Sequence, residues 1–292
     1  MRETARRLSF ALAALLLAAP AGAADLPPPP VPEPLPPMSG WTFRFVPYGW
    51  LTSLDGTQTV RGRSVKVNAS FTDIVEDSDT LVALMGDFEA RYGRFGLYTD
   101  VVWSNVSFSG GTVKTRNPAP GITGTVGAAL GLELETAIVE AGAIYEAARI
   151  GPLAFDLVAG ARYWYMKTDL SLDVAGTLEV GDLEVAGARA IARSGSVDWV
   201  DPFVGARLRY ALVPGHELFL RGDVGGFGAG SQFSWQAVGG YTWDFGVWNN
   251  ITFSGVIGYR ALYVNYETGS GRTRFEYDML EHGPIVGLSM RF

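Results

Sequence analysis

The chain has 292 residues, of which 30 are acidic and 23 basic, with no cysteine and only two histidines. The lack of cysteine excludes disulfides, thiolate catalysis and thiolate metal sites, and two histidines are too few for a multi-histidine metal centre. Because phosphate binding needs clustered lysine and arginine, the acidic balance argues against a nucleic-acid partner, and we expect no cofactor.

The amino-terminal segment predicts export. Three arginines precede a short apolar run at 8–19, and the small residues Ala21-Gly22-Ala23 follow it. This order is that of a secretory signal peptide. An apolar run of about a dozen residues is too short to span a bilayer. We therefore predict that residues 1–23 are a cleaved signal, and cleavage after Ala24 fits nearly as well.

A proline-rich segment comes next. Residues 25–37, DLPPPPVPEPLPP, hold eight of the sixteen prolines of the chain. So many prolines exclude a helix or a central strand and favour an extended, stiff polyproline-II conformation. We predict that 24–40 is a periplasmic tail and that 41–292 forms one barrel domain.

From Trp41 onward, strand-like segments alternate with turns. Apolar and polar residues alternate within these segments, as in half-buried β-strands. The one uncharged window long enough for a membrane helix, 224–243, carries six glycines and several polar residues, which suit a strand–turn–strand instead. The predicted strands cover 41–51, 80–92, 95–108, 132–147, 153–169, 199–212, 217–227, 232–245, 250–266 and 278–292.

The connections between these strands alternate in length. Short turns on one side and long loops on the other are typical of outer-membrane barrels, whose turns face the periplasm. We therefore predict an all-β fold, a transmembrane antiparallel up-and-down β-barrel of about ten strands, with eight to twelve open. The alternation LSLDV and DLEVAG within 170–198 could extend the flanking strands or add a hairpin. The predicted short turns are 93–94, 151–152, 213–216 and 246–249, and the mostly long loops are 52–79, 109–131, 170–198, 228–231 and 267–277.

Charged residues within the predicted strands share one face. A basic side chain that faces lipid at mid-bilayer costs about 2–4 kcal/mol, so this face must line the lumen. The near balance of signs favours mutual pairing of these charges. The predicted lumen-lining charges are Arg91, Glu140, Asp156, Arg162, Asp201, Arg207, Arg209, Arg221, Asp223, Asp244 and Arg260, together with Arg44, Asp87, Glu89, Asp100, Glu146, Glu281 and Arg291.

Aromatic residues gather near the ends of the predicted strands. Tryptophan and tyrosine concentrate at membrane–water interfaces, so we predict two interfacial girdles. The girdle candidates are Trp41, Trp50, Tyr92, Phe95, Trp103, Tyr145, Tyr163, Trp243, Trp248 and Tyr263.

The last strand ends on an aromatic residue. In HGPIVGLSMRF at 282–292, apolar residues occupy every second position from Pro284 onward. A closing strand of a barrel pairs with the first strand and leaves no free edge. The segment resembles the carboxy-terminal assembly signal of Gram-negative outer-membrane barrels. That resemblance implies recognition by the barrel-assembly machinery through Val286, Leu288, Met290 and Phe292.

Several longer stretches resemble a family of uncharacterised Gram-negative outer-membrane β-barrel proteins, which are small and porin-like. The resemblance spans 41–292 and implies a barrel in the outer membrane, with no established activity or site. The stretches are PYGWLTSLDGT at 47–57, ASFTDIVED at 69–77, FEARYGRFGLYTDVVW at 88–103, WVDPFVGARLRY at 199–210 and RGDVGGFGAGSQFSW at 221–235.

Two hypotheses for the lumen stay open: a salt-bridged plug, and a restricted conduit for small solutes. Eight strands leave room only for side chains, whereas water-filled porins have about sixteen, so about ten strands lie close to the filled end. The expected function is structural or weakly pore-forming. We expect a monomer surrounded by outer-membrane lipids.

We expect no enzymatic activity. Enzymatic outer-membrane barrels rely on a histidine with an acid or a serine at the outer rim or in the lipid-facing wall. His216 falls in a predicted periplasmic turn, and Ser289 lies about 23 Å along the strand from His282, too far to act as its nucleophile. Two alternatives stay open: an enzyme acting on lipid A or peptides through His282 and a partner such as Asp278, and a surface receptor or adhesin that uses the long external loops.

Two short motifs have structural interpretations. Arg221-Gly222-Asp223 spells a cell-adhesion tripeptide, but it falls within a predicted strand with both charges inward. Ser70 and Asp73 have the spacing of a helix capping box and predict a short helix through Asp77 in the first external loop. The acidic residues of that loop lack the glycine and spacing of a calcium site, so we interpret them as solvated surface.

Overall fold

The computed structural model describes residues 40–60, 63–116, 122–180 and 183–292. The predicted signal over 1–23 and nearly all of the predicted tail over 24–40 lie outside the described residues. No helix in the described part of the chain is long and apolar enough to cross a membrane. The elements are β1 (Trp41–Trp50), β2 (Ser53–Val60), β3 (Arg63–Ala69), α2 (Phe71–Asp77), β4 (Thr80–Tyr92), β5 (Phe95–Arg116), β6 (Ile122–Ile150), β7 (Leu153–Val180), β8 (Leu183–Val213), β9 (His216–Gly225), β10 (Phe233–Trp248), β11 (Ile251–Thr268), the 3-10 turn η1 (Gly271–Thr273) and β12 (Phe275–Arg291).

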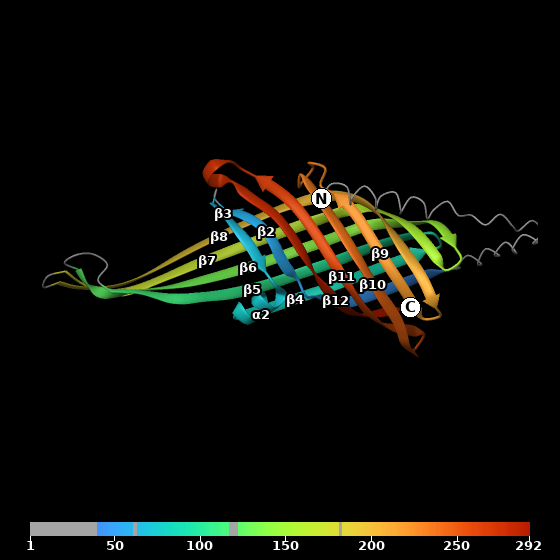
Figure 1. Cartoon of the computed structure of the whole chain (residues 1–292), viewed down its shortest axis with the longest axis horizontal. Helices are drawn as coiled ribbons and strands as arrows, with labels where there is room; N and C mark the ends of the chain where they lie inside the picture. Colours follow the sequence, from blue (N-terminus) through green and yellow to red (C-terminus); the bar gives the residue numbers. More distant parts are fainter. Residues whose placement is uncertain (1–39, 61–62, 117–121, 181–182) are drawn as a thin grey trace, which may run out of the picture. The chain divides into compact units, whose positions relative to one another are not determined.

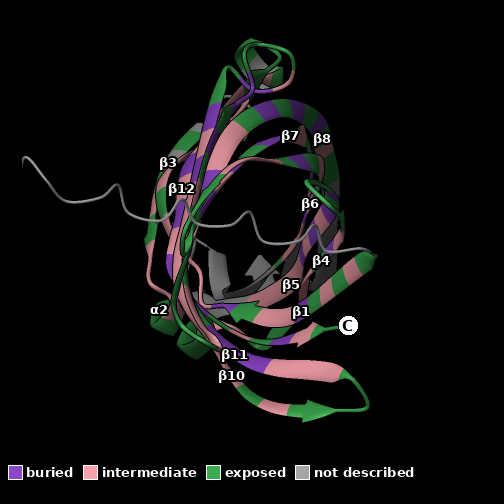
Figure 2. Cartoon of the chain, turned by 90° about the vertical axis from the view of Figure 1, so that its right-hand side faces the viewer, coloured by how far each residue is buried: buried purple, intermediate pink, exposed green. Residues whose placement is uncertain are grey.

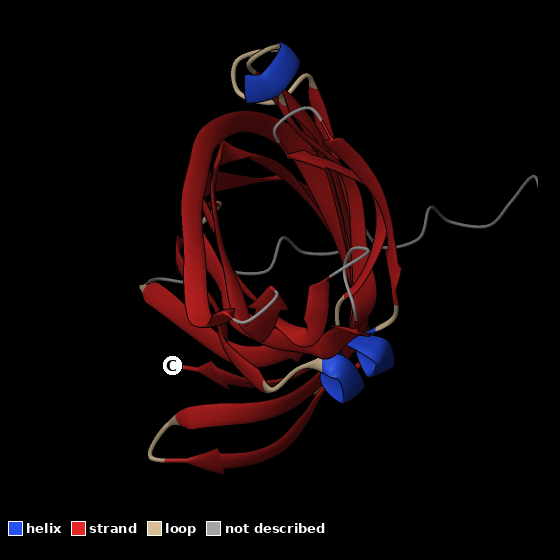
Figure 3. Ribbon diagram, turned by 90° about the vertical axis from the view of Figure 1, so that its left-hand side faces the viewer, coloured by secondary structure: helices blue, strands red, loops and turns tan. Residues whose placement is uncertain are grey.

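Ten strands close into a barrel, seen end-on in Figures 2 and 3. Strands β4 to β12 pair antiparallel with their neighbours in the chain, and β1 lies between β4 and β12. Phe43 and Phe292 exchange two backbone hydrogen bonds of 2.9 and 3.0 Å at the closing seam. Full closure leaves no edge in this part of the sheet. The predicted all-β, antiparallel, ten-stranded barrel is confirmed.

Strands β5 to β8 continue well beyond the rest of the barrel (Figure 1). The β7–β8 ladder runs without interruption to the pair Val180 and Leu183, and β5 still pairs with β6 at Arg116. In the described parts of 109–131 and 170–198 the prediction of loops is therefore wrong, and for 170–198 the alternative of extended flanking strands holds. Antiparallel pairing satisfies the backbone groups of each strand, so the strands need not end at the membrane surface.

The first external connection is also structured. Strands β2 and β3 form a hairpin, and β2 continues the sheet along the outer half of β12, from the pair Ser53–His282 to the pair Val60–Phe275. The predicted long loop over 52–79 is therefore a hairpin in this part, because the outer half of β12, beyond its pairing with β1, offers backbone partners to the chain that leaves β1.

Helix α2 follows the hairpin and begins with the predicted capping box. The Ser70 hydroxyl accepts from the amide of Asp73 at 3.2 Å, and the Asp73 carboxylate accepts from the amide of Ser70 at 2.9 Å. Hydrogen bonds from the Ser70 hydroxyl and amide lower the pKa of the exposed Asp73. The predicted short helix through Asp77 is confirmed, and none of its residues is buried.

Tight turns join the strands at the opposite end of the barrel, called the turn end here. Three of the turns contain a glycine with positive φ, as at Gly93 and Gly151. The fourth is made by Asn249 and Asn250, with φ of 46° and 64°, the conformation that a two-residue hairpin turn requires. The turn predicted over 246–249 is displaced, because β10 passes an irregularity after Asp244 and continues to Trp248.

The outer wall of the barrel is apolar and aromatic near the turn end. Trp41, Tyr92, Phe95 and Trp248 are each more than half exposed, as side chains of an interfacial girdle should be. Trp50 does not belong to the girdle. It is 3% exposed and points into the lumen, where the Arg260 guanidinium lies 4.8 Å from its ring centroid. Trp50 lies at a strand end, but the alternation of side chains along β1 directs it into the lumen.

Candidate functional site in the barrel lumen

Near the turn end, charged side chains from five strands form the turn-end cluster. The Asp156 carboxylate accepts from Arg91 at 2.8 Å and from both Arg207 and Arg209 at 3.0 Å. Glu89, from β4, accepts from Arg207 at 2.8 Å across the lumen. The members of the cluster are Arg44, Asp87, Glu89, Arg91, Glu146, Asp156, Arg207 and Arg209.

Further from the turns lies a second group, the central cluster, which is organised around Glu140. This fully buried carboxylate accepts from Arg162 at 2.9 Å, Arg221 at 2.8 Å and Arg260 at 3.2 Å. Asp223 bridges two of the same arginines. The members of the cluster are Asp100, Glu140, Arg162, Arg221, Asp223 and Arg260, with the hydroxyls of Tyr48 and Tyr98 bonded to its rim.

Each cluster is electrically neutral within itself. Among the members named above, the ion pairs join four arginines to four carboxylates in the turn-end cluster, and three arginines to three carboxylates in the central cluster. A further arginine, Arg149, pairs with Glu146 at 2.6 Å, but its side chain is 41% exposed, so water solvates its charge. A charge buried without a partner would cost several kcal/mol, so neutrality is what allows these groups to occupy a narrow barrel. A cavity of about 120 Å³ lies among them, bordered by residues of both clusters such as Asp87 and Arg221, and it has room for a few water molecules.

The remaining predicted lumen charges have other partners. Asp201 is buried and accepts from the Ser231 amide at 2.6 Å and the Ser231 hydroxyl at 2.8 Å, which folds the β9–β10 connection over the lumen. Asp244 lies at the turn-end mouth, where it accepts from Ser254 at 2.6 Å and from Arg291 at 3.2 Å. Neither carboxylate takes part in the two clusters.

An aromatic layer fills the outer half of the lumen. Trp164 stacks on Trp199 with ring centroids 5.4 Å apart, and Trp199 stacks on Tyr266 at 4.0 Å. Trp164 also meets the edge of Tyr277 at 6.3 Å. Strands β7 and β8 are not neighbours of β11 and β12 in the sheet, so these contacts cross the barrel. The layer consists of Trp50, Trp164, Trp199, Tyr266, Phe275 and Tyr277, within a larger apolar cluster.

This layer was not predicted, although the sequence holds a signal for it. Trp164 has the same strand parity as Arg162, and Trp199 the same parity as Asp201, so both tryptophans must point inward with those charges. For Trp50 too, strand parity and not nearness to a strand end decides which way the side chain faces.

Three polar residues, His282, Tyr259 and Ser53, lie near one another on the outer wall, at the end of the barrel away from the tight turns. The Nδ1 atom of His282 lies 2.6 Å from the Tyr259 hydroxyl. Ser53 pairs with His282 on the neighbouring strand β2. Leu54 of β2 packs on the lumen cluster and Glu281 of β12 is buried, so Ser53 and His282 both point away from the lumen.

Comparison with known proteins gives similarity of architecture only. No family model matches the chain, and no curated protein matches it. Solved structures similar to it include the outer-membrane protease OmpT of Escherichia coli, with 12% identity, 89% of this chain and 99% of that chain covered, and a TM-score of 0.40. Others are the translocator domain of the autotransporter NalP of Neisseria meningitidis (14%, 87% and 90%, 0.35) and Ail, the attachment invasion locus protein of Yersinia pestis (11%, 87% and 100%, 0.33).

A closed antiparallel sheet with an apolar outer wall and ion-paired charges inside is the architecture by which β-strands cross a bilayer. The protein is an outer-membrane β-barrel. The turn end therefore faces the periplasm, and the extensions of β5 to β8 project outside the cell.

The expectation that this barrel has no enzymatic activity has to be corrected. A protease is among the solved barrels that match the chain over most of its length. Because a fold does not determine function, the barrel architecture gives no ground for excluding catalysis.

Proposed function

We propose that this protein is an outer-membrane barrel of restricted permeability, with a structural role and at most a narrow path for small solutes. The proposal rests chiefly on the arrangement of the lumen in successive closed layers. The two neutral ion-pair clusters fill its periplasmic and central parts, and the aromatic layer crosses its outer part. Ten strands enclose too little space for these side chains and a wide aqueous channel together.

Single-channel recording in planar bilayers tests this proposal. We expect the refolded protein to show either no steps or steps at least about ten-fold smaller than those of a sixteen-stranded porin. Arg207→Glu would face Glu89 and Asp156 with a like charge, so we expect larger or more frequent openings in that variant. Arg291→Glu is the matched control, because Arg291 lies half exposed at the mouth.

Porin-sized steps from the unmodified protein would overturn the proposal. A folded Arg207→Glu variant with unchanged, silent bilayers would show that the turn-end cluster does not limit conductance.

We propose as a second candidate that the outward pair of His282 and Ser53 catalyses acyl-ester hydrolysis on an outer-leaflet lipid such as lipid A. The Tyr259 hydroxyl holds the Nδ1 side of His282, which leaves Nε2 to take the proton of the Ser53 hydroxyl. The Ser53 hydroxyl accepts from the Phe71 amide at 3.1 Å, which leaves its own proton to be donated. Cross-strand partners on one face have Cβ atoms about 4.5–5.5 Å apart, so rotation of the Ser53 side chain would bring the hydroxyl within reach of His282. The Ser53 oxygen would attack the ester carbonyl, the alcohol would leave with the proton, and water would then release the fatty acid.

Mass spectrometry of lipid A from cells that express the protein tests this candidate. We expect a lipid A species that lacks one acyl chain, absent with Ser53→Ala or His282→Ala. His216→Ala is the control, since the other histidine of the chain lies at the periplasmic end. Identical lipid profiles for the unmodified protein and Ser53→Ala would exclude this activity.

We also propose that the chain belongs to the family of uncharacterised small porin-like barrels that its sequence resembles. In this proposal residues 1–23 are a cleaved signal, 24–40 are a periplasmic tail and 41–292 insert as a monomer. The barrel-assembly machinery would recognise the terminal strand, whose apolar residues Val286, Leu288 and Phe292 are exposed on the outer wall, with Met290 partly so.

A further inference from the structure

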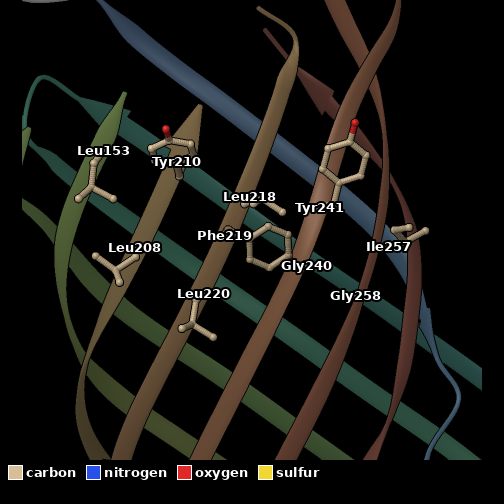
Figure 4. Close-up of a pocket in the computed structure, with 10 residues that line it drawn as sticks. All are labelled: Leu153, Leu208, Tyr210, Leu218, Phe219, Leu220, Gly240, Tyr241, Ile257 and Gly258. Atoms are coloured by element: carbon tan, nitrogen blue, oxygen red, sulfur yellow. The ribbon is translucent and has the colours of Figure 1, made fainter. Parts of the chain in front are cut away.

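An apolar groove of about 690 Å³ lies in the outer wall of the barrel, toward its periplasmic end (Figure 4). Its sides are the side chains of Leu208, Leu218, Leu220 and Ile257, from β8, β9 and β11, each between 39% and 56% exposed. These positions alternate with lumen residues along their strands, so the groove faces the bilayer and has no connection to the ion-pair clusters.

Glycines create the groove. Gly239 occupies the outward position between Leu220 and Tyr259 on the flanking strands and contributes no side chain. The backbone of the next residue, Gly240, and of its partner Gly258 forms the floor. A Cβ atom at Gly240 would lie 2.5 Å from the Ile257 carbonyl oxygen and 2.7 Å from the Phe219 ring, so both the backbone of β11 and the packing of Phe219 require this inward glycine.

Two tyrosines border the periplasmic end of the groove. Figure 4 shows the hydroxyls of Tyr210 and Tyr241 directed toward the same end, away from the leucines. The Tyr241 hydroxyl is also hydrogen-bonded to Nδ1 of His216. The groove is apolar along its length and has hydroxyl and imidazole groups at one end. An acyl chain joined to a polar ester and headgroup has the same distribution of apolar and polar groups.

We propose that the groove binds one acyl chain of a glycerophospholipid of the periplasmic leaflet, with the headgroup at Tyr210, Tyr241 and His216. Within the apolar band of a bilayer, lipid tails are the molecules in contact with the wall. The position of the tyrosines near the short turns selects the periplasmic leaflet over the outer one. This proposal is independent of whether the lumen conducts.

Native mass spectrometry tests the proposal. The protein is refolded into vesicles of phosphatidylethanolamine and phosphatidylglycerol, extracted with mild detergent and weighed with its retained lipid. We expect a species with one phospholipid, and we expect Gly239→Leu to lower its fraction at least about ten-fold by filling the groove. The new Cβ would lie 3.3 Å from the flexible end of Leu220, so the variant needs a shift of that side chain by a few tenths of an ångström.

Gly222→Leu is the matched control, an outward glycine of β9 whose added Cβ would have no neighbour nearer than 3.8 Å. It should retain the lipid. Ile257→Trp fills the groove from the opposite side and replaces Gly239→Leu if that variant fails to fold. The proposal is overturned if the unmodified protein carries no lipid, if a folded groove-filling variant retains it, or if the groove is covered by a second copy and dimers replace the lipid-bound monomer.

Discussion

Glu140→Gln is expected to lower the free energy of unfolding by about 3–5 kcal/mol, the range found when one partner of a buried ion pair is removed. Glu140 is 0% exposed and forms ion pairs with three arginines of the central cluster, one from each of β7, β9 and β11. Glutamine keeps the shape of the side chain but leaves the cluster with one uncompensated positive charge. Denaturant titration of the refolded barrel, followed by tryptophan fluorescence and by migration of unboiled samples on gels, measures the effect.

Glu133→Gln is the matched control on the same strand. Glu133 is exposed and accepts a hydrogen bond from Asn105, so its neutralisation should change stability by less than about 0.5 kcal/mol. Removing one arginine as well, in Glu140→Gln with Arg260→Gln, restores neutrality and should cost less than the sum of the two single substitutions. Equal midpoints for Glu140→Gln and Glu133→Gln would show that neutrality of the cluster does not stabilise the barrel.

Phe292→Asp is expected to reduce the amount of assembled protein in outer membranes several-fold while hardly changing the stability of the refolded barrel. Phe292 closes the seam through its backbone bonds to Phe43, which any residue can make, and its side chain is 44% exposed. An acidic residue near the interface costs only about 0–1 kcal/mol. A large loss in cells must therefore come from recognition of the terminal strand. Quantifying protein in membrane fractions, alongside refolding in detergent, separates the two effects.

Phe95→Asp provides the comparison, since Phe95 is a still more exposed aromatic residue at the same interface, outside the terminal strand. It should assemble at close to the normal level. Normal assembly of Phe292→Asp, or an equal loss for Phe95→Asp, would mean that the terminal strand is not the recognised signal.

The sequence by itself determined the barrel, a strand number of about ten within a range of eight to twelve, and the inward direction of its charges. All three follow from local periodicity: side chains alternate between two faces, and a charge facing lipid is costly enough to fix which face is which. Even the extension of β7 and β8 has a local signal in the sequence, because apolar and polar residues alternate in LSLDV and DLEVAG.

Only the tertiary structure decided what the inward residues contact. Arg207 meets Glu89 across 118 positions of sequence, and Trp199 meets Tyr266 from a strand that is not its neighbour. Such pairs depend on the tilt and stagger of the closed sheet, which set the level of each residue in the lumen and leave no trace in the pattern of a single strand. The same holds for the apolar groove of the outer wall, which exists because Gly239 and the paired Gly240 and Gly258 come together on adjacent strands.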